Sequence, residues 1–227
     1  MSTDLALARL LQLASPALPV GAYSYSQGLE AAIEAGVVCD SASAERWIGD
    51  VLLYGVARLE APVWWRLHAA WAAAAFEQVA HWNAFFRITR ETAEMRAETV
   101  QMGYSLRKLL SEMGQFELKP LARLDTVTDI TFPAAFTFAV VQWGIPARSA
   151  LLAYLWTWIE NQVMGALKAV PLGQTDGQRL LAALAARLPG VLDTAAAAVD
   201  ADLCNYTPGL AILSSRHETQ YSRLFRS

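Results

Sequence analysis

Apolar residues recur at the spacing of an α-helix along almost the whole chain. Near the N-terminus they fall at i, i+3, i+4 and i+7 and so share one helix face; these positions are Leu7, Leu10, Leu11 and Ala14. No stretch alternates apolar and polar residues over the length of a strand, and no repeat of fixed period is present. The pattern predicts an all-α fold, a single globular bundle of about ten helices over residues 1–227.

The composition indicates a folded chain that contacts other proteins. Apolar residues make up 55% of the chain and charged residues only 17%, against a usual charged share of roughly a quarter. This excludes intrinsic disorder, and it leaves too few charged side chains to cover a monomer, so we expect an oligomer or a complex. The net charge of −3 gives no basic face for phosphates, and no nucleic-acid partner is expected.

The most apolar region, residues 132–159, is too interrupted to cross a membrane. Spanning takes roughly 20 uninterrupted apolar residues, and four residues divide this region: Gln142, Gly144, Pro146 and Arg148. We expect two buried helices there, at about 133–143 and 147–169. The N-terminus lacks the basic-then-apolar layout of a signal peptide, which predicts a cytoplasmic protein without a membrane segment. Cys39 and Cys204 fit a reduced compartment, and whether they form a disulfide is left open.

Capping and breaking residues set other expected boundaries. Asp40, Ser41 or Ser43 is expected to cap a third helix that ends near Leu59, and Pro62 suits the first turn of a fourth. Residues 78–113 read as one or two long helices, followed by the longest connector, at 114–129. Two pairs at i, i+4 spacing predict solvated ion pairs without a functional role: Arg87 with Glu91 and Arg90 with Glu94.

Motifs for catalysis and metal binding are absent from the sequence. There is no P-loop, and the three histidines, His68, His81 and His217, lie far apart without a Cys or His at metal-ligand spacing. Ser24 or Ser26 with His217 is the only nucleophile and base that could be paired, and capping or turn packing explains both serines better. We therefore predict no enzyme, no cofactor and no metal site. An all-helical enzyme acting on a small apolar substrate, suggested by the eight tryptophans, stays as the alternative.

Three stretches carry a more specific signal. Residues 13–30 combine two prolines, two glycines, two tyrosines and three serines in a turn that leads into a helix. A second stretch covers 158–179, and a third covers 215–225. In this order and at this spacing they resemble the UreF family of urease accessory proteins, and the resemblance runs essentially from end to end.

The resemblance implies an all-α homodimer that binds the accessory protein UreD/UreH and the GTPase UreG, and that docks on apo-urease. UreF proteins are credited with coupling the GTP hydrolysis of UreG to nickel insertion. By the same resemblance, Tyr23 and Arg223 fall where the contacts to UreG lie. The rest of the tail, 208–227, corresponds to a segment that UreD/UreH orders.

The residue types of the tail support a partner-binding role on their own. Arginines outnumber its acidic residue and stand beside aromatic and aliphatic side chains, a mixture enriched at interface hot spots. Alone, the tail is expected to fray, with a helix docked on its own core as the alternative. The candidate partner-binding residues are Tyr23, Ser26, Glu30, Lys168, Gln174, Arg216, His217, Glu218, Tyr221, Arg223, Leu224 and Phe225.

Overall fold

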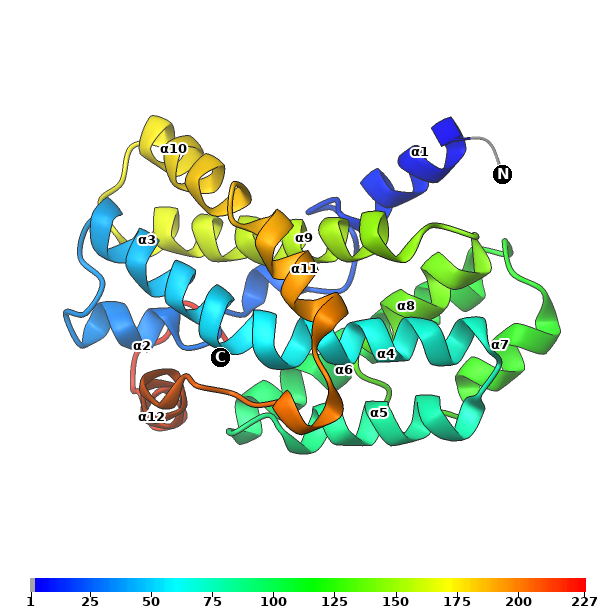
Figure 1. The fold of residues 1–227 in the computed structure, drawn as a ribbon. Coiled ribbons are helices and arrows are strands. Elements are labelled where there is room, and N and C mark those ends of the chain that lie inside the picture. Colours follow the sequence, from blue (N-terminus) through cyan, green and yellow to red (C-terminus); the bar gives the residue numbers. More distant parts are fainter. Residues whose placement is uncertain (1–2) are drawn as a thin grey trace.

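The computed structural model describes residues 3–227, which fold into one bundle of packed helices with no strand among them (Figure 1). The predicted all-α class and the single helical bundle are confirmed. The elements are α1 (Thr3–Leu13), η1 (Ala22–Ser24), α2 (Leu29–Glu34), α3 (Ser41–Asp50), η2 (Val51–Glu60), α4 (Ala61–Ala72), α5 (Phe76–Ile88), α6 (Ala93–Glu112), α7 (Leu118–Asp125), α8 (Phe132–Gln142), α9 (Ala147–Ala169), α10 (Gln174–Ala185), α11 (Leu188–Ala197), η3 (Asp200–Asp202) and α12 (Pro208–His217).

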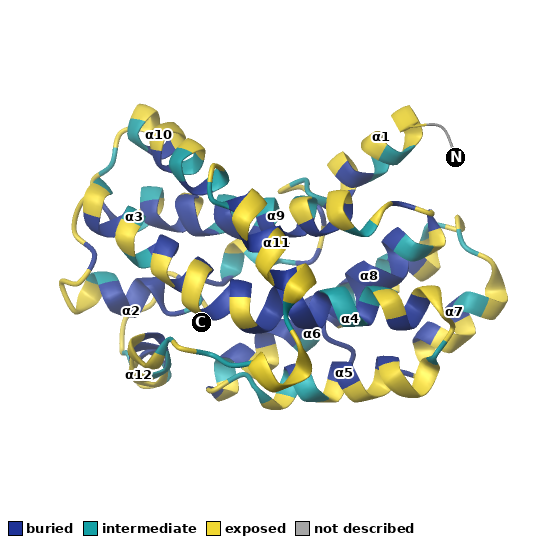
Figure 2. Ribbon diagram, in the orientation of Figure 1, coloured by how far each residue is buried: buried dark blue, intermediate teal, exposed yellow. Residues whose placement is uncertain are grey.

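Helix α8 forms the centre of the core. Every residue from Phe132 to Val140 is buried, and the helix packs against α4 and α6. Figure 2 shows α8 dark blue along most of its length, whereas α1 and α10 carry exposed outer faces. A helix that is apolar on all sides must be enclosed by other helices. The two buried helices expected here are therefore confirmed within one residue at each end.

One apolar stretch, Gln174–Ala197, is long enough by length and composition to cross a membrane, although only 39% of it is buried. It comprises two helices, α10 and α11, and Pro189 lies in the first turn of α11. Between them, Arg187 forms an ion pair with Glu45 of α3 at 2.6 Å. A single stretch of this kind, divided and paired to its own chain, is weak support for a membrane span.

Helices α3, η2 and α4 follow one another without the break expected between Leu59 and Pro62. Asp40 caps α3 as expected, accepting the backbone N–H of Ser43 at 2.7 Å. The ten residues of η2 are π-helical, so the N–H of Ala61 donates to the carbonyl of Val56, five residues back. Proline breaks a helix partly because it lacks a donor, and this change of register directly before Pro62 lets the chain continue as a helix.

The two predicted i, i+4 ion pairs do not form, because α5 ends at Ile88 and α6 begins only at Ala93. Arg87 instead pairs with Asp129 at 2.5 Å, and Arg90 pairs with the buried Glu60 at 3.2 Å. The expected connector at 114–129 also differs from the prediction, since α7 lies within it. In both places the prediction rested on local sequence spacing, whereas the structure there also depends on tertiary contacts.

Helix α1 buries less of its predicted face than expected. Leu10 and Leu13 are buried, but Leu7 is 57% exposed and Leu11 is 63% exposed. The helix projects from the body of the protein, packed against α9 (Figure 1). The periodic leucines therefore predicted the helix correctly, while the chain itself covers only part of its apolar face.

The candidate partner-binding site at the C-terminal segment

The tail folds back onto the N-terminal part of the chain, as in the alternative that the sequence left open. Helix α12 packs against α2, and residues 218–227, here called the C-terminal segment, continue toward η1. The N–H of Ser26 donates to the carbonyl of Ser227 at 2.7 Å, and the N–H of Arg226 donates to the carbonyl of Ser24 at 2.7 Å. Phe225 and Ser227 are buried. The expected fraying is thus replaced by a docked segment.

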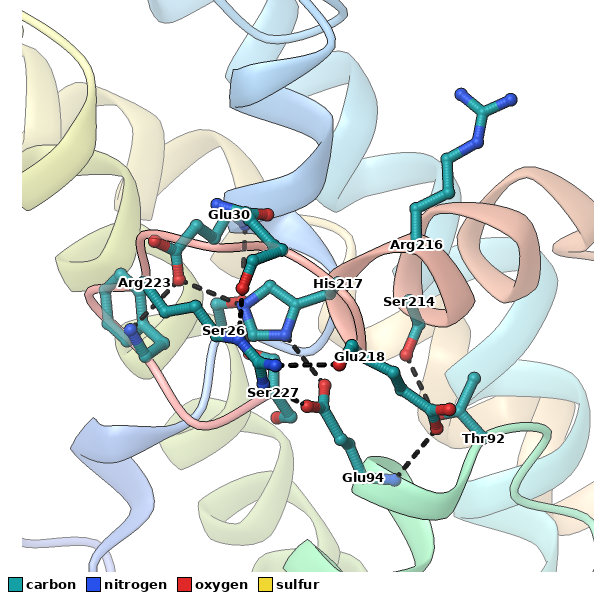
Figure 3. Close-up of polar contacts among 12 residues, drawn as sticks. Ser26, Glu30, Thr92, Glu94, Ser214, Arg216, His217, Glu218, Arg223 and Ser227 are labelled. Carbon is teal, nitrogen blue, oxygen red and sulfur yellow. Dashed lines mark hydrogen bonds and ion pairs between the residues drawn. The ribbon is translucent and has the colours of Figure 1, made fainter.

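Glu30 of α2 is the main attachment point of the segment (Figure 3). Its carboxylate accepts the backbone N–H of Leu224 at 2.6 Å and that of Phe225 at 2.9 Å. One of its oxygens also lies 3.1 Å from Nε2 of His217. Glu30 is only 6% exposed, and a buried carboxylate is tolerated only where several donors surround it.

His217, at the end of α12, lies completely buried between two carboxylates. Its Nδ1 is 2.7 Å from Glu94 of α6, and its Nε2 faces Glu30. Through these two contacts the ring links α2, α6 and α12.

Arg223 and Glu218 fasten the segment to α6. Arg223 contacts Glu94 through Nη1 at 2.5 Å and donates to the carbonyls of Gln220 and Glu218 at 2.9 and 2.7 Å. The side chain of Glu218 accepts the N–H of Ala93 at 2.8 Å. A carboxylate at this position satisfies the free amides of the α6 N-terminus and complements the helix dipole.

Side chains at the start of the second stretch hold the first stretch in place. Trp158, Asn161 and Gln162 project from α9 and donate, respectively, to the side chain of Gln27 at 2.7 Å, the carbonyl of Tyr25 at 3.0 Å and the carbonyl of Ser26 at 3.2 Å. Further along α9, Lys168 lies over the rings of Tyr23 and Phe225 at 5.9 and 5.5 Å. All three stretches singled out in the sequence therefore meet in one place.

Four candidates point outward from this cluster and form what we call the exposed patch: Tyr23, Arg216, Tyr221 and Leu224. Tyr221 is fully exposed, and Tyr23 and Leu224 are 64% and 71% exposed. Arg216 extends away from the buried contacts (Figure 3). Gln174 is also exposed, but it lies at the start of α10 and takes no part in the cluster.

A small cavity of about 50 Å³ lies beneath the cluster. Its ionisable groups largely bind one another: Glu60 accepts from Tyr154 at 2.5 Å and pairs with Arg90 at 3.2 Å. Small-molecule sites usually measure several hundred Å³ or more, so this volume suits a few water molecules. Within residues 3–227, no group of three or more metal-binding side chains is found, and both cysteines are free.

Comparison with known proteins gives the family. A family model described as UreF matches residues 38–185, more than half of the chain. The chain belongs to the UreF family. Its relatives include "Urease accessory protein UreF" from Azoarcus sp. (strain BH72), 59% identical over 98% of this chain and 96% of the relative, and proteins of the same name from Dechloromonas aromatica (strain RCB), 52% identical over 100% of both chains, and Janthinobacterium sp. (strain Marseille), 52% identical over 98% of both.

The UreF model covers only part of the three stretches. It includes the whole of the second, which ends at residue 179, but neither the first nor the third. The full-length UreF relatives cover both of these as well. The predicted family is thus confirmed over the whole chain, including the tail.

Several residues of the site were missed by the sequence analysis. Glu94 was assigned to a solvated pair, and Glu98, one turn further along α6, was not singled out. Glu98 is 4% exposed and accepts from Gln27 at 2.6 Å and from Ser227 at 2.8 Å. Gln27 has the left-handed φ of 53°, which is uncommon outside glycine and often marks a functional constraint. Its position in the first stretch was the one available signal.

Proposed function

We propose that this chain is a non-catalytic, cytoplasmic assembly protein of urease maturation. In this proposal it acts as a homodimer, binds UreD/UreH and the GTPase UreG, docks on apo-urease, and couples GTP hydrolysis to nickel insertion. Its UreF relatives bear the name of urease accessory proteins. The observation that carries the proposal is the convergence of the three family stretches on one cluster that fixes the exposed patch.

The exposed patch has the chemistry of a protein interface. Tyr221, Leu224 and Tyr23 present apolar area to solvent, and Lys168 lies over the rings of both Tyr23 and Phe225. Arg216 adds a cation, and aromatic residues with arginine are the side chains most enriched at hot spots. The buried contacts of Glu30 fix the backbone at Leu224 and Phe225. A partner therefore meets an ordered surface and loses less entropy on binding.

Arg223 has a positioning role in this proposal. Its guanidinium already contacts Glu94 and two backbone carbonyls of its own segment. To act on the phosphates of GTP as an arginine finger, it would first have to give up these contacts. The contacts of Arg223 therefore support a role in docking the segment over a direct part in GTP hydrolysis.

Co-elution of purified proteins tests the proposal. The chain, UreG and UreD/UreH are mixed and separated by size-exclusion chromatography, with and without GTP and nickel. We expect a common complex, and we expect Tyr221→Ala together with Leu224→Ala to weaken it at least tenfold. Ile88→Ala is the matched control, because Ile88 is 69% exposed but lies outside the cluster. Failure to form a complex under every condition would refute the proposal.

A test in cells addresses nickel insertion. Urease is purified from cells that lack this protein, and its nickel content is measured by mass spectrometry. We expect little nickel without the protein and recovery when the gene is restored. Full nickel occupancy in its absence would exclude the proposed role even if a complex forms in solution.

A helical enzyme is the second candidate, because Glu60, Arg90, Glu98 and Tyr154 converge on the buried cavity. The cavity volume of about 50 Å³ would first have to grow severalfold to admit a substrate of ordinary size. Turnover of a small molecule by the isolated chain, abolished by Glu98→Gln, would favour this candidate over the assembly role.

A further inference from the structure

The C-terminal segment is attached through buried groups that can gain or lose protons. Glu98 of α6 accepts the hydroxyl of Ser227 at 2.8 Å through one oxygen and the side-chain amide of Gln27 at 2.6 Å through the other. It is 4% exposed. An ionised carboxylate buried in this way needs a cation or several donors, whereas a protonated carboxyl has a much smaller desolvation cost.

Other ionisable groups surround Glu98 on every element packed against it. Glu60 of η2 pairs with Arg90, which lies in the turn between α5 and α6, at 3.2 Å. Tyr154 of α9 donates to Glu60, and Tyr25 faces Glu98 from the turn before α2. Arg90 pairs directly with Glu60, so its charge lowers the pKa of Glu98 without forming an ion pair with it. Burial outweighs the favourable contacts and raises the pKa of Glu98 to about 7.

His217 adds a second buried contact to the same attachment. Its two nitrogens face Glu94 and Glu30 at 2.7 and 3.1 Å, and Arg223 contacts the other oxygen of Glu94. These contacts join α2 and α6 to the end of α12 and to the segment.

We infer that the C-terminal segment is a proton-coupled latch, held most tightly when Glu98 carries its proton and loosened as the pH rises toward neutrality. The inference concerns the isolated chain and does not depend on which partners it binds.

The direction of the pH dependence follows from the linkage between protonation of Glu98 and docking of the segment. When the segment leaves, Glu98 becomes solvated, and its pKa returns toward the ordinary value of 4.5. Between about pH 4.5 and about pH 7 the docked form holds a proton that the released form has lost. Each pH unit in this window therefore lowers the docking equilibrium constant by up to about tenfold, and the dependence levels off above the window.

Hydrogen exchange of the full chain, followed by mass spectrometry from pH 5 to pH 8, tests the latch. Exchange of the amides in 218–227 is divided by that of an unstructured peptide of the same sequence, which removes the intrinsic effect of pH. We expect the protection of Leu224 and Phe225 to fall by about ten- to a hundredfold between pH 5 and pH 7. In Glu98→Gln, which mimics the protonated carboxyl, we expect a clearly shallower fall.

Two controls separate the latch from general instability. The amides of α8 report global unfolding, which also exposes Glu98; their protection should therefore share the pH slope of the segment but stay far higher at every pH. Ser227→Ala removes one donor but keeps Glu98, so it should lower the protection at every pH and retain the slope. Equal protection of α8 and the segment, a flat wild-type profile, or an equal slope in Glu98→Gln would each overturn the inference.

Discussion

The carboxylate of Glu30 accepts the backbone N–H of Phe225 at 2.9 Å, across 195 residues of sequence. The first and last stretches of the family resemblance therefore share one buried side chain. The same carboxylate also binds His217 and the N–H of Leu224. Through these contacts one buried glutamate on α2 sets the conformation of the C-terminal segment. The sequence alone predicts that this segment frays.

Replacing Glu30 should detach this segment. Glu30→Gln removes the charge opposite His217 and one of the acceptors, and we expect it to lower the free energy of unfolding by about 2 to 3 kcal/mol, the range for hydrogen bonds to charged groups. Urea denaturation measures the change. Glu34→Gln is the control, since Glu34 is exposed on the same helix and should shift stability by less than about 0.5 kcal/mol. Equal effects of the two variants would contradict the assigned role.

Local signals predicted the central helices well. Gly144 and Pro146 separate α8 from α9 as expected, and Gly144 takes the left-handed φ of 62° that favours glycine at a helix end. Helix α8 is buried from Phe132 to Val140, so its burial does not depend on which face it presents, whereas α9 is buried on part of its surface only. The π-helical turns of η2 were not predicted, since the chain runs from α3 through η2 into α4 without a break.

The buried polar residues of the site could not be predicted in the same way. Glu94 and Glu98 lie one turn apart on α6 and read as ordinary surface residues. Glu98 is buried and Glu94 is half-buried, and both contact the C-terminal segment, more than a hundred residues away in sequence. Glu30 and His217 were candidates through the family resemblance, and their mutual contact followed only from the fold.

Close packing of α6 against the chain before α8 gives a second prediction. A Cβ at Gly103 would lie 2.1 Å from the carbonyl oxygen of Ile130, so backbone must move. We expect Gly103→Ala to destabilise the fold by about 3 kcal/mol, near the upper end for overpacking. At Gly190 of α11 no atom lies within 4 Å, and Gly190→Ala should be neutral or stabilising by up to about 1 kcal/mol. Thermal unfolding of both variants checks the contrast, and a milder effect at Gly103 would contradict it.

The hydroxyl of Tyr154 gives a third prediction. It donates to the buried Glu60 at 2.5 Å, and burial keeps the pKa of Tyr154 well above its usual value, so the donor persists at all ordinary pH values. Tyr154→Phe leaves Glu60 with Arg90 as its remaining partner and should cost about 1 to 3 kcal/mol. Tyr104→Phe, at a 49% exposed position, should have little effect. Urea denaturation of the two variants should therefore differ clearly, and equal midpoints would show that the Glu60 contact is not stabilising.

Two arginines of the tail separate positioning of the segment from direct contact with a partner. Arg223 binds Glu94 and two carbonyls, whereas Arg216 extends into solvent (Figure 3). The Arg223 side chain is 32% exposed, so its ion pair is worth about 1 kcal/mol. Arg223→Ala should therefore raise hydrogen exchange of the segment in the isolated chain and also weaken assembly with UreG and UreD/UreH. Arg216→Ala should weaken assembly alone, because it removes only a surface contact. Exchange rates, co-elution and GTP turnover are measured for both variants. If Arg223→Ala instead assembled normally and lowered only GTP turnover, Arg223 would act on the nucleotide, and the positioning role would be wrong.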